Sequence, residues 1–298
     1  MMRKLNSGLT SWLRASNHNS MMLKQESGIG KPEDLGIVKI AYFGSSAFRL
    51  TTPQGLSIMI DPWRNHPSRT WDWYFKDMPL TKIDIGISTH AHFDHDALDR
   101  LDASVLLDRP IGQYSFLDVL IDGIADKHAT DSSAATYDFK LIHKRFNGVD
   151  IEPPDNPRSW DNVIVVIETG GLRFLHWGDN RHNPPDYVWE KLGNVDVALL
   201  PVDDSQHVMG FEMVDSIIDR LRPKVVIPHH YFLMDVTQRQ STLLPATKWL
   251  QTQSRVVHLS SAETQFSKMT LPTDTTIHHF GEHVAFDAEE WRSRPEED

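Results

Sequence analysis

The sequence contains no cysteine among its 298 residues. Disulfides, thiolate zinc sites, iron–sulfur clusters and cysteine nucleophiles are therefore excluded, and any bound metal must be held by nitrogen and oxygen atoms. No apolar run approaches the ~20 residues that a membrane-spanning helix requires. Positive charge is also scarce, because 41 acidic residues outnumber 30 lysines and arginines and give a formal net charge of -11. This balance argues against a nucleic-acid partner, and we expect a small-molecule substrate.

The first 36 residues differ in character from the rest of the chain. Four basic residues precede the first acidic residue, Glu26. This composition predicts a poorly ordered extension, with an organellar transit peptide or a membrane-surface helix as alternatives. We expect residues 37–285 to form one domain and residues 286–298 to form an acidic tail. The expected location is the cytoplasm, or an organelle if the basic N-terminus is a transit peptide.

Hydrophobic alternation predicts two similar halves. In the first half, a hairpin over 48–60 ends at Asp61 and a strand follows at 83–88. In the second half, a hairpin over 162–176 leads to Asp179 and a strand follows at 195–200. This pseudo-repeat predicts two αβ halves packed sheet against sheet, with polar loops meeting at one edge. Helices are further predicted at 97–101, 114–124, 186–192 and 213–221, and strands at 37–43, 105–107 and 224–227.

A histidine-rich octet, Thr89–Asp96, follows the strand at 83–88. Imidazole and carboxylate groups at a strand end are suitable zinc ligands, whereas a core would have to satisfy every ring nitrogen with a hydrogen bond. The octet therefore predicts a metal site. A single catalytic zinc needs three protein ligands plus water, so four candidates in one loop indicate two metals. These candidates are His90, His92, Asp94 and His95.

Three further candidate ligands follow other apolar segments. Asp179 stands after the second hairpin, where a carboxylate can bridge two cations. His143 ends the alternating stretch 139–142, and His230 follows the strand at 224–227. Alternatives remain for each position: His128 for His143, His176 or His182 for Asp179, and His229 for His230.

The segment His90–His95 matches the HxHxDH signature of the metallo-β-lactamase superfamily, and the chain resembles that family from about Val38 to Tyr231. Asp61 in Met59–Trp63, His143, Trp177–Asp179 and Ile227–Tyr231 resemble its other motifs. The motifs are similar to those of the branch that includes ascorbate-6-phosphate lactonase and N-acyl-phosphatidylethanolamine phospholipase D. By this resemblance the histidine used in the last motif is His230.

The resemblance implies an α/β fold, a four-layer αβ/βα sandwich of the metallo-β-lactamase type. It also implies two divalent metal ions, Zn²⁺ with Mn²⁺ or iron as alternatives. One ion is expected on His90, His92 and His143, and the other on Asp94, His95 and His230, with Asp179 bridging. Asp61 is expected to orient a ligand histidine rather than bind metal.

The expected activity is metal-dependent hydrolysis of a small ester, lactone or phosphodiester by a hydroxide shared between the metals. Asp94 is the candidate that orients this water or accepts its proton, and His207 is a candidate proton donor. Alternatives are a membrane-associated phosphodiesterase of the phospholipase D type and a non-hydrolytic iron enzyme, because one fold carries many chemistries. The residues expected to shape the substrate pocket are Trp63, Trp71, Trp73, Phe93, Tyr231 and the loop around His207, which includes Asp204.

Overall fold

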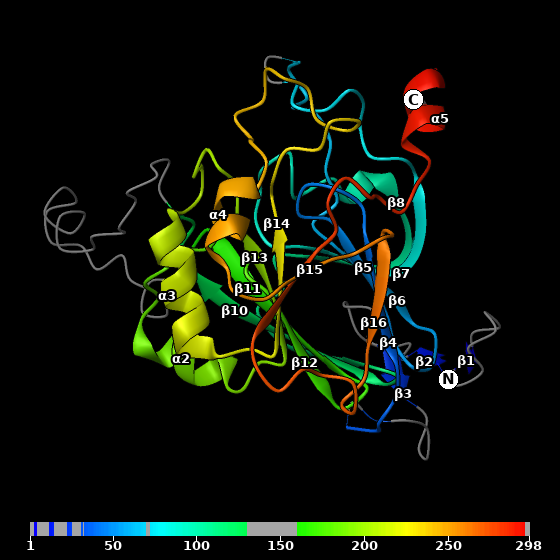
Figure 1. Cartoon of the computed structure of the whole chain (residues 1–298). Helices are drawn as coiled ribbons and strands as arrows, with labels where there is room; N and C mark the ends of the chain where they lie inside the picture. Colours follow the sequence, from blue (N-terminus) through cyan, green and yellow to red (C-terminus); the bar gives the residue numbers. More distant parts are fainter. Residues whose placement is uncertain are drawn as a thin grey trace, which may run out of the picture.

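The computed structural model describes residues 3–4, 12–14, 23–25, 31, 33–69, 72–129 and 160–295. Two large mixed β-sheets form the centre of the molecule (Figure 1). Phe48 of one sheet contacts His176 and His229 of the other, with ring centroids 6.0 and 5.8 Å apart. The sheets therefore pack against each other, as the α/β sandwich of the metallo-β-lactamase type requires. Short strands β1 (Arg3–Lys4), β2 (Trp12–Arg14) and β3 (Leu23–Gln25) form a separate small sheet.

The first large sheet has six strands in the order β16-β4-β5-β6-β7-β8. The hairpin expected at 48–60 is confirmed by antiparallel pairing of β5 with β6, and β7 and β8 then add in parallel. The strand bounds are β4 (Val38–Tyr42), β5 (Phe48–Thr51), β6 (Ser57–Ile60), β7 (Thr81–Ser88), β8 (Leu101–Asp108) and β16 (Glu263–Phe266).

The second large sheet has eight strands in the order β15-β17-β14-β13-β12-β11-β10-β9. Its central hairpin, β11 with β12, is again followed by two parallel strands, β13 and β14. The bounds are β9 (Gly112–Phe116), β10 (Val119–Asp126), β11 (Asn162–Thr169), β12 (Leu172–His176), β13 (Val197–Pro201), β14 (Val225–His229), β15 (Val256–His258) and β17 (Thr276–His279).

The predicted pseudo-repeat is thus present in the strand pairing. In both halves an antiparallel hairpin is followed by parallel strands, so β6 and β7 end at one edge of their sheet, and β12, β13 and β14 end at one edge of theirs. Asp61, the octet, Asp179 and His230 all follow these carboxyl ends. Side chains that are far apart in the sequence are thereby brought to one region of the molecule.

The helix expected at 114–124 is wrong, because this segment is the hairpin of β9 and β10. Leu117, at the turn, has a φ of 43°. Asp118 accepts hydrogen bonds from the Thr52 hydroxyl at 2.7 Å and the Gln54 amide at 3.0 Å. These contacts with the other sheet stabilise a turn where the apolar spacing alone fits a helix.

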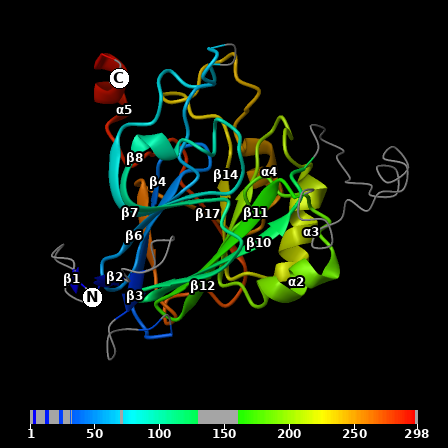
Figure 2. The same ribbon diagram turned by 180° about the vertical axis from the view of Figure 1, so that it is seen from behind.

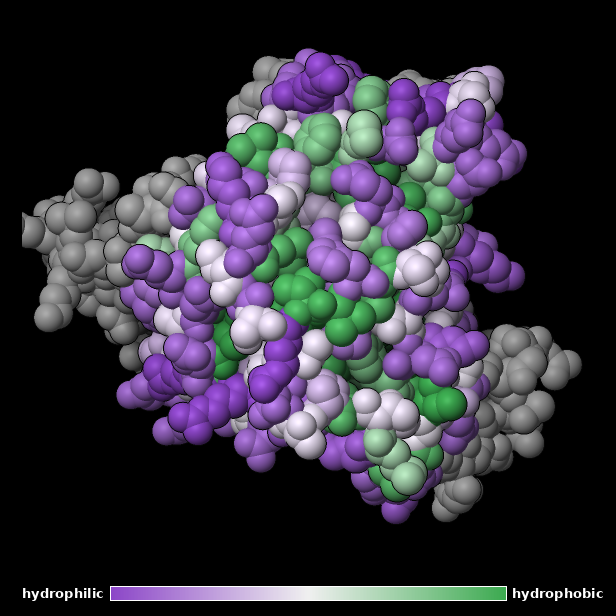
Figure 3. Space-filling view, viewed as in Figure 1, coloured by the Kyte–Doolittle hydropathy of each residue, from purple (hydrophilic) through white to green (hydrophobic). Residues whose placement is uncertain are grey.

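Three helices cover the outer face of the eight-stranded sheet: α2 (Asp186–Leu192), α3 (Phe211–Leu221) and α4 (Thr247–Thr252). Figures 1 and 2 place α2 and α3 on the side of that sheet that faces away from β4–β8. Each turns apolar side chains inward, as Val214 and Ile217 of α3 do, while mostly hydrophilic side chains cover the outer surface of α2 and α3 (Figure 3). The positions of both helices agree with their prediction.

The six-stranded sheet carries little helix. The predicted helix at 97–101 is a single 3₁₀ turn, η1 (Leu98–Arg100). The segment expected to be an acidic tail contains α5 (Ala288–Ser293), which is capped by Asp287 and begins next to the folded body. Its Trp291 is only 9% exposed, and its ring lies 5.8 Å from that of Trp63. Within the described residues, no helix combines the length and apolar character needed to cross a membrane.

Candidate metal centre

The octet is held in place by the carboxylate of Asp61. Thr89 donates its backbone N–H to Asp61 Oδ1 at 2.7 Å and its hydroxyl to Oδ2 at 2.8 Å. The loop then turns back on itself, because the backbone N–H groups of His95 and Asp96 both donate to the His92 carbonyl. This turn presents the imidazoles and Asp94 from a short span of chain to one point.

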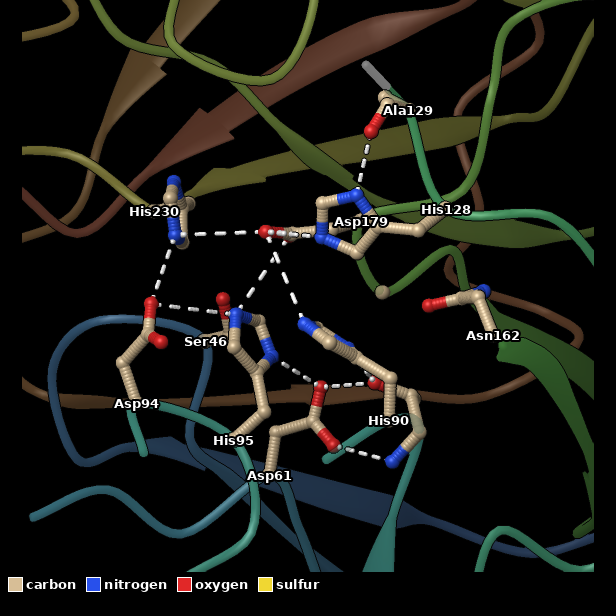
Figure 4. Close-up of polar contacts among 12 residues, drawn as sticks. Ser46, Asp61, His90, Asp94, His95, His128, Ala129, Asn162, Asp179 and His230 are labelled. Carbon is tan, nitrogen blue, oxygen red and sulfur yellow. Dashed lines mark hydrogen bonds and ion pairs between the residues drawn. The ribbon is translucent and has the colours of Figure 1, made fainter. Parts of the chain in front are cut away.

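Three imidazoles form the first candidate cluster, namely those of His90, His92 and His128. The three ring centroids lie 4.6 to 4.8 Å apart. His128 follows β10, and its Nδ1–H donates to the carbonyl of Ala129, which leaves Nε2 directed into the cluster (Figure 4). His143, the ligand expected here, lies outside the described residues. The alternative, His128, occupies the third corner of the cluster.

Asp94, His95 and His230 form the second candidate cluster. Asp94 Oδ2 lies 3.1 Å from His230 Nε2 and 3.4 Å from His95 Nε2. The His95 ring is oriented by Asp61, whose Oδ2 accepts a hydrogen bond from Nδ1 at 2.7 Å. This contact leaves His95 Nε2 facing the cluster, and a carboxylate so placed can orient a ligand histidine.

Asp179 lies between the two clusters (Figure 4). Its Oδ1 is 3.5 Å from His95 Nε2, and its Oδ2 is 3.6 Å from His128 Nε2 and 3.7 Å from His230 Nε2. Gly178 permits this approach, since its φ is 57° and a Cβ there would lie 2.8 Å from Thr89 Oγ1. A single carboxylate is thus within reach of ligand atoms from both clusters.

Burial and charge set the ionisation of these groups in the metal-free protein. Burial alone would raise the pKa of Asp179, but the imidazoles of His230 and His95 lower it well below its ordinary value. Asp94 behaves similarly, because His95 and His230 outweigh burial. Burial and the nearby His95 lower the pKa of His90 well below its ordinary value. The carboxylates and His90 are therefore in the forms that bind metal. Burial would lower the pKa of His95 and His230, but Asp179 and Asp94 raise it, so these two imidazoles must release a proton when metal binds.

Four buried ligand atoms have no hydrogen-bond partner within the described part of the chain: His90 Nε2, His95 Nε2, His128 Nε2 and Asp179 Oδ1. Buried polar groups are normally paired, and separations of 3.4 to 4.0 Å between these ligand atoms and their neighbours are too long for good hydrogen bonds. Cations coordinated in the two clusters would satisfy these atoms. The donor set of nitrogen and oxygen suits zinc, manganese or iron.

The rival histidines of the second half have other partners. His176 Nε2–H donates to the Ser46 carbonyl at 2.9 Å, and its Nδ1 accepts from the Gly178 backbone at 3.1 Å. His229 is fully buried, stacks on His176 with ring centroids 4.8 Å apart, and bonds Ser46 Oγ through Nδ1. Neither ring belongs to a cluster, so among these neighbours His230 is the histidine that faces the site.

A cavity of about 700 Å³ opens above the centre. Asp94, Asp179 and His92 reach it from the clusters, and His207 lines it as expected. The other described residues that line it are Arg64, His66, Pro67, Trp73, Ala91, Phe93, Asp96, Gln240 and Thr242. Trp71, also expected at the pocket, lies outside the described residues.

Three residues expected in the pocket do not line this cavity. Trp63 is fully buried in the core, where its Nε1–H donates to the Phe43 carbonyl at 2.9 Å. Tyr231 is 2% exposed and donates its hydroxyl to the Gly281 carbonyl. Asp204 Oδ1 instead accepts from the Lys248 backbone N–H at the start of α4. Aromatic or polar character at a motif does not reveal which way a side chain points.

A buried polar network behind the site was not predicted. Arg181 and Asp126 form an ion pair, and Asn180 bridges Asp126 and Asn162 through 2.7 and 3.1 Å hydrogen bonds. The sequence feature that could have indicated this network is closeness to candidate ligands. Arg181 stands two residues after Asp179, and Asp126 stands two residues before His128.

The chain is similar to proteins that are already known. A profile described as the beta-lactamase superfamily domain matches residues 39–230. A UPF0173 metal-dependent hydrolase of Pyrobaculum islandicum is 30% identical over 198 residues, covering 65% of this chain and 84% of the relative. A second UPF0173 metal-dependent hydrolase, from Cupriavidus necator, is 26% identical over 215 residues, covering 66% of this chain and 74% of the relative.

Solved structures agree on the fold. A Thermotoga maritima protein assigned to the metallo-β-lactamase superfamily aligns with a TM-score of 0.56 at 22% identity, covering 81% of this chain and 97% of that one. An isothiocyanate hydrolase from Delia radicum gut bacteria aligns with a TM-score of 0.50 at 15% identity, covering 84% and 99%. With the strand order and the histidine–aspartate clusters, these matches show that the chain belongs to the metallo-β-lactamase superfamily and is a metal-dependent hydrolase.

Proposed function

We propose that this protein hydrolyses a small ester or lactone with two divalent metal ions. His90, His92 and His128 would hold one ion, and Asp94, His95 and His230 the other, with Asp179 between them. The observation that carries the proposal is the convergence of four unpartnered, buried ligand atoms from separate segments onto one point beside a cavity. When bound, such ions supply Lewis acidity and a water molecule with a pKa near neutrality.

Asp94 is the residue proposed to orient the attacking water. Its carboxylate lines the cavity, and neighbouring His95 and His230 keep it ionised by lowering its pKa. An ionised carboxylate in this position can accept a hydrogen bond, or a proton, from water as it attacks the carbonyl carbon. Asp179 faces both clusters and would keep their ligands at a fixed separation.

His207 is proposed as the proton donor to the leaving oxygen. It lines the cavity, and its ring stacks parallel to that of His230 with centroids 5.9 Å apart and planes inclined by 10°. The ring is partly exposed, so it can exchange protons with solvent between turnovers. Hydrolysis breaks the bond from the acyl carbon to the leaving oxygen, and that oxygen must then gain a proton.

Metal content and a substrate screen test the proposal together. Elemental analysis of the purified protein should give two metal equivalents per chain, and Asp179→Asn should lower both metal content and activity. Asp122→Asn on β10 is a matched control that should change neither. The screen compares lactones, carboxylic esters and phosphodiesters after loading with zinc, manganese or iron. Full activity in metal-free protein, or iron-dependent oxidation without hydrolysis, would contradict the proposal.

A further inference from the structure

One wall of the cavity is built from four aromatic rings, those of His66, Trp73, Phe93 and His207, which we call the aromatic wall. Trp73 lies at its centre, with its ring centroid 5.3 Å from Phe93 and 5.5 Å from His207. His66 extends the row, 5.8 Å from Phe93. All three contacts are edge-to-face, with interplanar angles of 71° to 84°, an arrangement that aromatic rings favour.

The aromatic wall adjoins the ligand clusters. Phe93 lies between His92 and Asp94 in the octet, and His207 stacks on His230. The Trp73 ring itself is 6.3 Å from that of His230. A substrate whose reacting carbon faces the clusters would therefore have its organic group against these rings.

Backbone hydrogen bonds fix the wall in place. The Phe93 carbonyl accepts from the Arg64 N–H at 3.0 Å, and the Trp73 carbonyl accepts from the Gln238 N–H at 2.7 Å. The rings come from three separate parts of the chain: the segment between β6 and β7, the octet and the loop after β13. The loop after β13 is held by the Asp204 N–H, which donates to the Pro245 carbonyl at 3.1 Å. Because all three parts have such backbone contacts, the wall is a pre-formed surface.

The charge of the cavity argues for a neutral substrate. Among the described lining residues, Arg64 is the single lysine or arginine. Its Nη1 lies 3.0 Å from Asp96 Oδ1 and 3.3 Å from Asp99 Oδ1, so two carboxylates already neutralise it. Phosphate groups are usually bound by unshared arginine or lysine side chains.

We propose that the substrate is a neutral carboxylic ester or lactone with an aromatic or flat apolar group that lies against Trp73 and Phe93. This inference rests on the proposed hydrolysis and narrows it to one substrate class. Water adds its oxygen to the acyl carbon and the acyl carbon–oxygen bond breaks. An ester gives a carboxylate and an alcohol, a lactone gives a single hydroxycarboxylate, and one proton is released in each case. A phosphodiester substrate is the competing class.

The kinetic test compares ethyl phenylacetate with ethyl acetate, because both esters release ethanol and differ in the acyl group alone. In the metal-replete protein, we expect kcat/KM to be roughly tenfold higher for the phenylacetate ester, as aromatic contact and buried area together suggest. Trp73→Leu should bring this ratio close to one, and Trp73→Phe should restore much of it. Trp189→Leu on α2, outside the cavity, should leave the ratio and the activity as they are.

A binding experiment separates failure of the inference from failure of the proposed function. Phenylacetamide and acetamide are titrated calorimetrically into the metal-replete protein and into Trp73→Leu. Tighter binding of phenylacetamide that depends on Trp73, without ester hydrolysis, would support the aromatic wall and refute ester hydrolysis. An ester ratio near one in the unaltered protein, absence of Trp73-dependent binding, or faster turnover of diphenyl phosphate than of ethyl phenylacetate would overturn the inference.

Discussion

Arg181 donates hydrogen bonds to the carboxylate of Asp126 from two nitrogens. Its Nε lies 3.1 Å from Oδ1 and 3.0 Å from Oδ2, and its Nη2 lies 2.5 Å from Oδ1. Both side chains are at most 2% exposed. Between them, the Arg181 N–H donates to the Lys127 carbonyl and the Ala129 N–H donates to the Asp179 carbonyl. The ion pair therefore links the segment that contains His128 to the segment that contains Asp179, and both residues lie at the candidate metal centre.

Arg181→Met should destabilise the fold, because it leaves the buried Asp126 carboxylate without its cationic partner and with the Asn180 amide as its remaining side-chain donor. Removing one member of a buried ion pair costs about 3–5 kcal/mol. Urea denaturation of the chelator-treated protein measures this loss. The double variant Arg181→Met with Asp126→Leu should recover much of it, since neither charge then remains buried. A single variant as stable as the original protein would show that the pair does not hold these segments together.

Asp61→Asn should weaken metal binding without removing a ligand. The amide can no longer accept hydrogen bonds at both oxygens, so the orientation of His95 and of Thr89 is lost in part. Changes to groups that orient metal ligands typically lower affinity by about 10–100-fold. Competition with a chromogenic chelator measures this affinity. Asp84 of β7 accepts hydrogen bonds from the backbone N–H and the hydroxyl of Ser57, so Asp84→Asn is the control. Equal metal affinities in the two variants would be evidence against the positioning role of Asp61.

Two adjacent histidines should respond differently to the same substitution. His230→Gln is expected to remove about one equivalent of metal, because its Nε2 faces Asp94 and Asp179. His229→Gln should retain the metal and lower stability by about 1–3 kcal/mol, since it disturbs a buried hydrogen bond to Ser46. Elemental analysis and urea denaturation of both variants provide the comparison. Metal loss from His229→Gln alone would reverse the assignment.

The partly buried His279 should make stability depend on pH. Burial, followed by the effect of His258, lowers its pKa from 6.5 to about 4. As the pH falls below about 6.5, the unfolded chain takes up a proton that the folded chain accepts only near pH 4. The unfolded state then binds more protons, so the free energy of unfolding decreases through this range.

His279→Gln should therefore lose less stability than the unaltered protein between pH 7 and pH 5. The difference in stability loss should be on the order of 1 kcal/mol, because solvent near the partly exposed ring weakens the effect. Urea denaturation of metal-free protein at both pH values measures it. The exposed His283→Gln is a control that should keep the original pH dependence, and parallel pH profiles for all three proteins would contradict the prediction.

Local sequence patterns were sufficient for the strand ends and for most of the residues that form the two candidate clusters. The octet places three imidazoles and Asp94 in one loop, and alternation identifies the strands that deliver Asp179 and His230. By contrast, the residues at 117, 120, 121 and 124 have the spacing of an apolar helix face, yet they form a hairpin because Asp118 bonds the opposite sheet. The spacing of apolar residues carries no information about this long-range contact of Asp118.

Side-chain direction was also beyond the sequence. Trp63 and Trp73 belong to the same connecting segment, but one packs in the core and the other lines the cavity. The ion pair of Arg181 with Asp126 joins residues 55 positions apart, and only the antiparallel bridge between His128 and Asn180 brings them together. Such pairings depend on tertiary packing, which no local motif encodes.

The convergence of ligands from distant strand ends has a consequence for the chain as a polymer. Asp94 and His230 are separated by 136 positions and follow strands of different sheets. An ion bound to both closes a long loop, and it restricts the unfolded ensemble, as a covalent cross-link would, for as long as it stays attached at both ends. Because the protein has no cysteine and so no disulfide, metal bound at this centre would be the cross-link between its two halves.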